Sequence, residues 1–280
     1  MLAAGITFPS IPALYEIPVL GPVITQAYEQ LPSNLKTQIP ANVRAQLAPP
    51  AKPRPGTPAA NTQAQLEALN AEVLGRHEGR ATISVAGAGM QMTAGDNRPE
   101  PAFSTMKVPT AIFALRTNPE MYADAEAAIT QSDNDATARL AAVVPGVALD
   151  AVIAEAGSRT SNTAAWRMGT LWTTSDQAQF ASGLRCVAGH EPALEMMGRI
   201  APHQRWGLGR IPGAKFKGGW NYYEDGHLAR QFGLIPGPGG DIAVAITAYS
   251  PHGHTESFAM LDELADGIAH LRGQLPAARC

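Results

Sequence analysis

Apolar residues recur at helical spacing in two stretches that lie far apart in the chain. Residues 62–76 and 256–275 each carry an apolar residue every three or four positions, which is typical of amphipathic helices. These positions are Leu66, Leu69, Val73 and Leu74 in the first stretch, and Phe258, Leu261, Leu264, Ile268 and Leu271 in the second. Both stretches are therefore predicted to be helices that pack one side against a core.

Short apolar runs predict four strands. One covers residues 81–88, and the others cover 215–218, 228–235 and 241–249, with a Pro/Gly turn at 236–240 between the last two. From Phe103 to about Ile200 the pattern is mostly helical and Ala-rich, with a loop near 157–163. This order favours an α+β fold of two lobes, in which a sheet forms from both ends of the chain and a helical lobe, about 103–205, is inserted into it.

The first 60 residues differ from the rest. Residues 48–58 hold five prolines and one glycine, a composition typical of a stiff, extended linker. We therefore expect an N-terminal arm over 1–47, with short helices near 23–30 and 34–46, a linker over 48–60 and one domain over 61–280. Prolines interrupt the early apolar stretch and the first basic residue is Lys36, so the N-terminus does not fit an intact signal peptide.

Composition excludes several classes of protein. Of the 280 residues 45% are apolar and 16% charged, which fits a folded domain, and the net charge of -3 without a basic block argues against nucleic acid as a partner. Only His252 and His254 have close spacing, and we interpret them as solvated, so no metal or other cofactor is predicted. Cys186 and Cys280 could form one disulfide, but two separate thiols are the simpler interpretation.

The first candidate motif is an S-x-x-K sequence, Ser104 to Lys107, at the start of a predicted helix. This spacing puts a hydroxyl and an amine on one helix face, where a buried amine of lowered pKa can accept the serine proton. A single S-x-x-K is most often an exposed helix face, and Ser33 to Lys36 is a second copy in this chain.

Two further motifs follow. Ser132-Asp133-Asn134 lies between two helical runs, and it either aims a hydroxyl and an amide into a cleft or is a plain helix cap. Lys217 precedes two glycines and Trp220 on a predicted strand, where glycines such as Gly219 let a substrate approach the strand closely, or mark a bulge.

Together the three motifs, in this order, resemble the signature of class A β-lactamases and penicillin-binding proteins. The resemblance covers residues 61–280 and extends to AAITQSDNDATARL, LWTTSDQAQFASGL and QRWGLG, which are similar to secreted actinobacterial members. It implies a secreted or cell-envelope location, a β-lactam or cell-wall peptide substrate, and a possible envelope partner for residues 1–47.

The resemblance also implies a role for each matching residue. Ser104 would be the nucleophile and Lys107 its general base, while Ser132 would pass a proton to the leaving group. Asn134 would contact the substrate or Lys107, and Lys217 would tune Ser132. The backbone N–H groups of Ser104 and Trp220 would form the oxyanion hole. Arg230, on the next strand, is either a clamp for a substrate carboxylate or an ordinary surface arginine.

Three departures from the family pattern limit the functional prediction. Gly218 stands where a Thr or Ser hydroxyl is usual, the 28-residue spacing from Ser104 to Ser132 is short, and residues 157–174 contain no Glu to activate a deacylating water. Asn162 could match the asparagine of that loop, and Glu155 is the nearest carboxylate. These departures favour a serine hydrolase or transferase with slow deacylation, acting on β-lactam, cell-wall peptide or ester substrates. The alternatives are a catalytically idle module of the cell envelope and a true class A-like β-lactamase.

Overall fold

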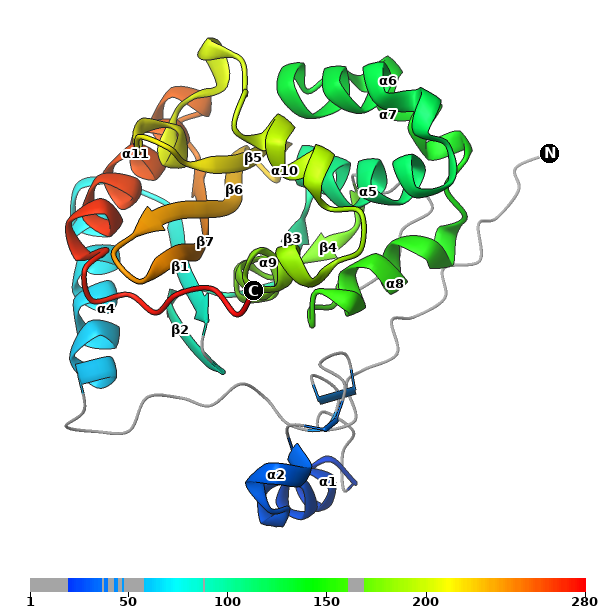
Figure 1. Ribbon diagram of the computed structural model, residues 1–280. Coiled ribbons are helices and arrows are strands. Elements are labelled where there is room, and N and C mark those ends of the chain that lie inside the picture. The colour runs from blue at the N-terminus through cyan, green and yellow to red at the C-terminus, as the bar shows by residue number, and fades with distance from the viewer. Residues whose placement is uncertain are drawn as a thin grey trace.

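The computed structural model describes residues 20–36, 58–87, 89–160 and 169–280, together with residues 38, 39, 43, 44 and 47. A five-stranded antiparallel sheet, in the order β2-β1-β7-β6-β5, forms one lobe, and helices form the other (Figure 1). The strands are β1 (Arg80–Gly87), β2 (Met90–Gly95), β5 (Lys215–Tyr223), β6 (Gly226–Gly237) and β7 (Gly240–Ser250).

The centre of the sheet joins the two ends of the domain. β1 pairs with β7 so that Ile83 lies opposite Ile246 and Val85 opposite Val244, and all four side chains are buried. β-Branched side chains fit such a pleated, buried surface. The predicted strands are confirmed, but the sequence missed β2, an edge strand in which only Met92 and Ala94 are buried.

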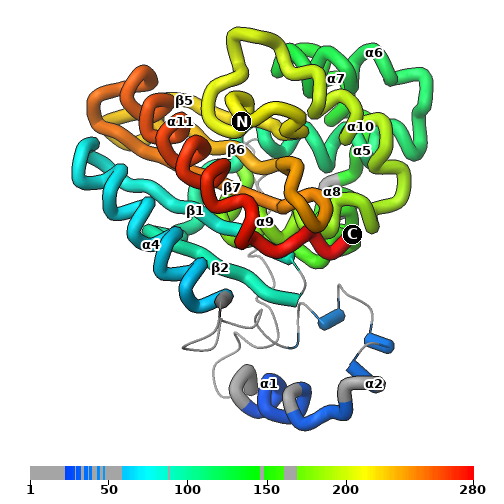
Figure 2. Tube along the Cα trace, turned by 60° about the vertical axis from the view of Figure 1, so that its left-hand side comes forward, coloured from blue at the N-terminus to red at the C-terminus, as the bar shows by residue number. Residues whose placement is uncertain are grey.

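Helices cover both faces of the sheet. α4 (Pro58–Arg76) and α11 (His254–Leu271) lie side by side on one face, and α9 (Thr174–Gly183) lies on the other (Figure 2). Gly267 of α11 lies directly against Leu69 of α4, where a larger residue would separate the two helices. The ring of Phe180 on α9 packs against those of Trp172 and Phe232, and the ring centroids of the three are 5.4–5.9 Å apart.

The helical lobe lies between β2 and β5 in the chain, as the sequence predicted. Its helices are α5 (Lys107–Thr117), α6 (Tyr122–Glu126), α7 (Asn134–Ala142), α8 (Gly146–Glu155) and α10 (Glu191–Met197). Shorter turns are η2 (Phe103–Met106), η3 (Pro119–Met121), the π-helical η4 (Ala127–Gln131), η6 (Leu184–Cys186), η7 (Pro202–Gln204) and η8 (Gly207–Arg210). A small second sheet, β3 (Glu100–Pro101) with β4 (Leu171–Trp172), was not predicted because its strands have two residues each.

The N-terminal region agrees with the sequence in part. α1 (Leu20–Gln30) covers one expected helix, whereas α2 (Ser33–Lys36) is shorter than the helix expected over 34–46, part of which lies outside the described residues. α4 begins at Pro58, so the last three residues of the predicted linker are helical, because proline fits the first turn of a helix. None of the helices in the described ranges is long and apolar enough to cross a membrane.

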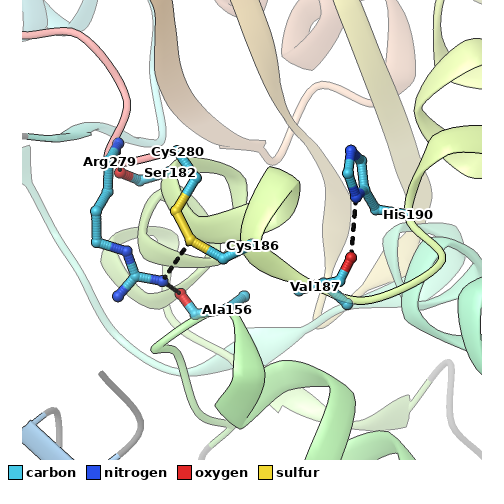
Figure 3. The surroundings of a disulfide bond; sticks show 7 residues. All are labelled: Ala156, Ser182, Cys186, Val187, His190, Arg279 and Cys280. Atoms are coloured by element: carbon cyan, nitrogen blue, oxygen red, sulfur yellow. Dashed lines mark hydrogen bonds between the residues drawn. A yellow bond between two sulfur atoms is a disulfide. The ribbon is translucent and has the colours of Figure 1, made fainter. Parts of the chain in front are cut away.

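The two cysteines form a disulfide, so the preference for two separate thiols was wrong (Figure 3). The Cα atoms of Cys186 and Cys280 lie 5.7 Å apart, within the usual range for a disulfide. The chain after α11 crosses back to the end of α9, where the backbone N–H of Arg279 donates to the Ser182 hydroxyl at 3.0 Å. The Arg279 guanidinium donates to the carbonyl of Ala156 at 2.9 Å. The sequence could not reveal this pairing, because the pairing depends on the path of residues 272–280 after α11.

Candidate active site

Ser104 lies on a short turn that connects the small sheet to the longest helix of the helical lobe. It is the second residue of η2, which leads directly into α5, and its side chain is half-buried. Phe103, the residue before it, has φ of 47°, a backbone conformation that is uncommon for residues other than glycine. Such strain is frequent where a fold has to present a functional side chain.

Lys107 lies one turn after Ser104 and is fully buried. Its Nζ atom donates to the backbone oxygen of Ser132 at 2.6 Å and to Oδ1 of Asn134 at 2.8 Å, and it lies 3.4 Å from the Ser132 hydroxyl. Burial lowers the pKa of Lys107 to about 8, against a smaller opposing effect of the Asp133 charge. An amine with this pKa is partly neutral near physiological pH and can then accept a proton.

Ser132 occupies the turn between η4 and α7. It adopts the left-handed conformation, with φ of 57°, and this turn brings its backbone oxygen and its hydroxyl to Lys107. The next residue, Asp133, is the N-cap of α7, and its side chain accepts a hydrogen bond from the Ala136 N–H at 2.7 Å. The helix-cap interpretation is therefore right for Asp133, while Ser132 and Asn134 contact the buried lysine.

Lys217 reaches the same hydroxyl from the sheet. It is fully buried on β5, and its Nζ atom lies 3.0 Å from the Ser132 hydroxyl and 2.9 Å from the carbonyl of Gly218. Burial, together with the nearby charge of Lys107, lowers the pKa of Lys217 well below its ordinary value. The structure thus brings residues from all three sequence motifs together around one hydroxyl.

β5 also lies close to the turn that carries Ser104. A Cβ atom at Gly219 would lie only 2.9 Å from the backbone nitrogen of Ser104 and 2.9 Å from the carbonyl oxygen of Ala102. Glycine is therefore required at this position for close approach, as the sequence suggested. Trp220 follows on β5, which is an edge strand, so alternate N–H groups along it have no partner strand.

Gly218 lies against the indole of Trp206. A Cβ atom at Gly218 would lie 3.0 Å from Cη2 and 3.2 Å from Cζ2 of that indole. An aromatic ring therefore fills the space into which a Thr or Ser side chain would project. Sequence reasoning missed Trp206 as part of the site, although it lies in the QRWGLG stretch that supported the family resemblance.

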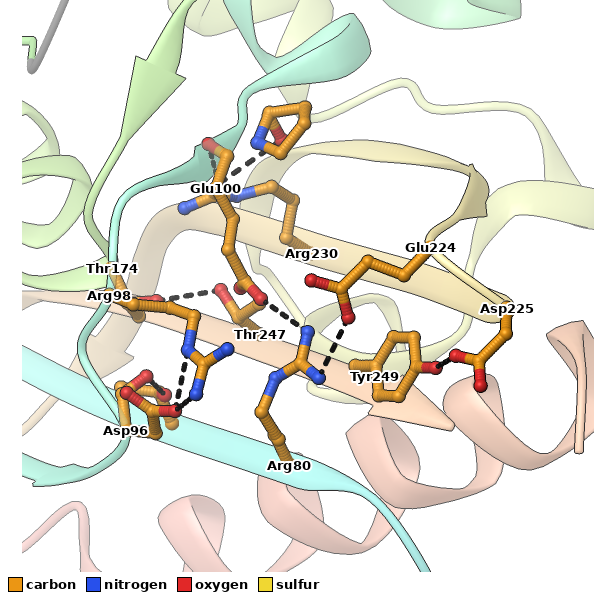
Figure 4. A network of polar contacts seen from close by, with 12 residues as sticks. Arg80, Asp96, Arg98, Glu100, Thr174, Glu224, Asp225, Arg230, Thr247 and Tyr249 are labelled. Atoms are coloured by element: carbon orange, nitrogen blue, oxygen red, sulfur yellow. Dashed lines mark hydrogen bonds and ion pairs between the residues drawn. The ribbon is translucent and has the colours of Figure 1, made fainter. Parts of the chain in front are cut away.

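The side chain of Arg230 points into the core. It is fully buried, and Figure 4 shows it beside Glu100. Its guanidinium donates to the carbonyl oxygens of Glu100, Pro101 and Trp172 and to Oε1 of Gln177, at 2.8–3.2 Å. Neither expectation, a carboxylate clamp or a surface arginine, agrees with this position. Instead, Arg230 ties β6 to β3 and β4.

Gln177 extends this network to the turn that carries Ser104. Its Nε2 atom donates to the hydroxyl of Thr105 at 2.8 Å, and that hydroxyl donates in turn to the carbonyl of Ala102. Both residues are fully buried, and Thr105 directly follows Ser104. Arg230 therefore supports the turn that carries Ser104 indirectly, because it holds Gln177, which in turn holds Thr105.

Glu155, the carboxylate nearest to the loop in the sequence, forms an ion pair away from Ser132 and the two lysines. Glu155 forms a two-pronged ion pair with Arg116, at 2.5 and 2.8 Å, on the surface of the helical lobe. Asn162 lies outside the described residues, as do the other residues from 161 to 168. His252 contacts Glu78 at 3.0 Å, and in the described ranges no group of three His, Cys, Asp or Glu side chains could hold a metal ion.

Comparisons with known proteins identify the fold. No protein-family model matches the chain, and no curated protein matches it either. Solved structures do match. β-Lactamases from Chitinophaga pinensis and Sphaerobacter thermophilus align with TM-scores of 0.60 and identities of 16% and 19%, covering 75% and 76% of this chain and 98% of theirs. One from Xanthomonas campestris aligns with a TM-score of 0.59 and 17% identity, covering 76% of this chain and 99% of the other. The chain therefore has the fold of the serine β-lactamases.

Proposed function

We propose that this chain is a serine hydrolase or acyltransferase that forms an acyl-enzyme on Ser104. The observation that carries the proposal is the convergence of two buried amines, Lys107 and Lys217, on the hydroxyl of Ser132. Burying two lysines close together costs free energy of folding, and this cost supports a functional role for the pair. Groups with strongly perturbed pKa values cluster at functional sites.

The arrangement supports a simple sequence of proton transfers. Neutral Lys107 would take the proton of Ser104 as the serine oxygen attacks a carbonyl carbon. Ser132 would give its proton to the leaving group and be replenished from Lys107 or Lys217. The N–H groups of Ser104 and Trp220 would stabilise the oxyanion, a contribution of about 3 kcal/mol for each such donor.

The fate of the acyl-enzyme distinguishes this proposal from a true β-lactamase. Residues 157–174 contain no carboxylate, and Glu155 is held by Arg116. Without a group to activate water, hydrolysis of the acyl-enzyme would be slow, so the proposed activity is acylation by a β-lactam, a cell-wall peptide or an ester. We further propose an exported protein whose residues 1–47 contact an envelope partner.

The alternative is an idle member of the fold that serves as a binding module. One observation favours it: within the described part of the chain, Lys107 donates to the Ser132 turn and to Asn134, and no hydrogen bond joins it to the Ser104 hydroxyl. Lys107 would have to release one of these contacts before it could accept the serine proton.

Time-resolved intact-protein mass spectrometry tests the proposal. Wild type and Ser104→Ala are incubated with a penicillin and, separately, with p-nitrophenyl butyrate. A long-lived adduct on the wild type alone supports the proposal. Rapid consumption of the penicillin without an adduct supports a true β-lactamase. No adduct and no turnover with either compound favours the idle module.

A further inference from the structure

Strand β5 presents its residues alternately to two faces, as strands do. Lys217 and Gly219 are on the face of the helical lobe, where they approach Ser132 and Ser104. Gly218 and Trp220 are on the opposite face, which is covered by α11 and by the loop that carries Trp206. Because β5 is an edge strand, a substrate aligned along its open edge beside Ser104 would lie between the two faces and meet side chains of both.

These side chains form an aromatic wall, which we define as Trp206, Trp220, Phe258 and His227. The rings of Trp206 and Phe258 are stacked, with centroids 4.4 Å apart. Trp220 meets Trp206 edge-on at 5.6 Å, and His227 meets Phe258 edge-on at 5.6 Å. Trp206 and Trp220 are only partly buried, so part of the wall is open to a ligand.

The wall is held rigidly. Gln231, fully buried opposite Gly218, donates to the carbonyl of Trp206 at 2.8 Å and accepts from the N–H of Leu208 at 2.6 Å. Asp262 of α11 accepts from the N–H of Gly207, and Gly207 adopts φ of 55° close to the Gln231 side chain. The backbone from Trp206 to Leu208 is therefore anchored to β6 and α11, and this positions the indole of Trp206 against Gly218.

The wall offers no positive charge to a carboxylate. Gly218 has no hydroxyl, and the indole occupies the space for one. Burial and the neighbouring His254 lower the pKa of His227, so its ring is neutral at physiological pH. Arg230, on the same strand as His227, is directed into the core. A carboxylate placed against these rings would lose hydration without compensation.

We propose that the Ser104 site takes uncharged acyl donors, esters or amides that present an apolar group, and not a carboxylate, to the aromatic wall. This inference rests on the proposed function. In the reaction, the Ser104 oxygen bonds to the carbonyl carbon and the bond to the leaving alcohol or amine breaks. The serine proton reaches the leaving group by way of Lys107 and Ser132. Water then cleaves the acyl ester, releasing a carboxylic acid and restoring the serine.

A matched pair of reagents tests this inference: benzylpenicillin and its methyl ester, which differ at the carboxylate alone. The rate of acylation of Ser104 by each is measured by intact-protein mass spectrometry. We expect the methyl ester to acylate the wild type at least about tenfold faster than the free acid. In the double variant Trp206→Ala/Gly218→Thr, which restores space and a hydroxyl, this ratio should fall toward one. Tyr122→Ala, an exposed aromatic residue on α6, is the control and should keep the wild-type ratio.

Each outcome distinguishes the two proposals. If the free acid acylates the wild type as fast as the ester or faster, the preference for uncharged donors is wrong, but Ser104 is still a nucleophile. If benzylpenicillin, its methyl ester and p-nitrophenyl butyrate all leave Ser104 unmodified, the proposed function fails and the inference fails with it. The wild-type ratio decides the inference even if the double variant does not fold.

Discussion

The hydroxyl of Ser132 lies 3.0 Å from the Nζ atom of Lys217, although the two residues are 85 positions apart in the chain. The first belongs to the helical lobe and the second to the edge of the sheet, so this contact joins the two lobes beside Ser104. The Nζ atom of Lys107 approaches the same hydroxyl at 3.4 Å. The chemistry of the site therefore depends on which of these amines carries a proton.

The pKa of Lys107 predicts a pH dependence. Because burial lowers this pKa to about 8, the amine is mainly protonated below that pH and mainly neutral above it. In the proposed mechanism neutral Lys107 accepts the serine proton, so the acylation rate of Ser104 should rise with pH, with its midpoint near 8. Stopped-flow kinetics with a p-nitrophenyl ester measures the profile.

Lys107→Arg is the control for this profile, because arginine keeps the positive charge but does not lose its proton. The variant should acylate about 100- to 10,000-fold more slowly, the usual contribution of a general base. A flat profile in the wild type, or full activity in Lys107→Arg, would show that another group is the base.

The role of Ser132 predicts an effect that depends on the leaving group. Ser132→Ala removes the hydroxyl that would protonate a departing amine. Acylation by a penicillin should slow by about 100-fold or more, whereas acylation by a p-nitrophenyl ester should change little, because that leaving group departs as an anion. Equal losses with both compounds would instead indicate a general distortion of the site.

The buried position of Arg230 predicts a structural role. Arg230→Met should lower the free energy of unfolding by about 3 kcal/mol or more, because four oxygen atoms lose their donor at once. Arg210→Ala is a matched control, since Arg210 is exposed and pairs with Asp266 on the surface, and it should cost less than about 1 kcal/mol. Similar midpoints for both variants in urea denaturation would contradict the assignment.

The disulfide predicts a dependence of stability on redox conditions. It closes a separation of 94 residues, so Cys280→Ser should lower the free energy of unfolding by about 2–4 kcal/mol. A reductant should destabilise the wild type by a similar amount and leave Cys280→Ser unchanged. If the reductant has no effect on the wild type, the two cysteines are thiols in solution.

The sequence predicted the parts of the site that depend on motif order and local structure. Ser104 begins a helix, Ser132 lies between two helices, and Lys217 lies on a late strand, each as expected. What could not be predicted depends on strand register and direction. The buried position of Arg230 depends on its pairing with Gly219 and on the small sheet that its guanidinium contacts. Two-residue strands leave no pattern in the sequence, so this position could not be predicted.

The replacement of a hydroxyl by an indole illustrates the same limit. In the sequence, Gly218 indicated only that a Thr or Ser hydroxyl is missing. The neighbouring residues in the chain did not indicate which side chain fills the space of that hydroxyl. Trp206 reaches it because Gln231, on the adjacent strand, fixes the backbone on both sides of Gly207. That contact joins residues 25 positions apart and is visible only once β5 and β6 are in register.

The most direct test of the central claim is to label the protein with a fluorophosphonate and map the modified residue by peptide mass spectrometry. The chain provides its own control, because Ser33 and Lys36 repeat the S-x-x-K spacing on α2, away from the two lysines at Ser132. We predict a single label on Ser104, none on Ser33, and loss of labelling after denaturation. An unlabelled Ser104 in the folded protein, or equal labelling of Ser33, would contradict the assignment of Ser104 as the nucleophile.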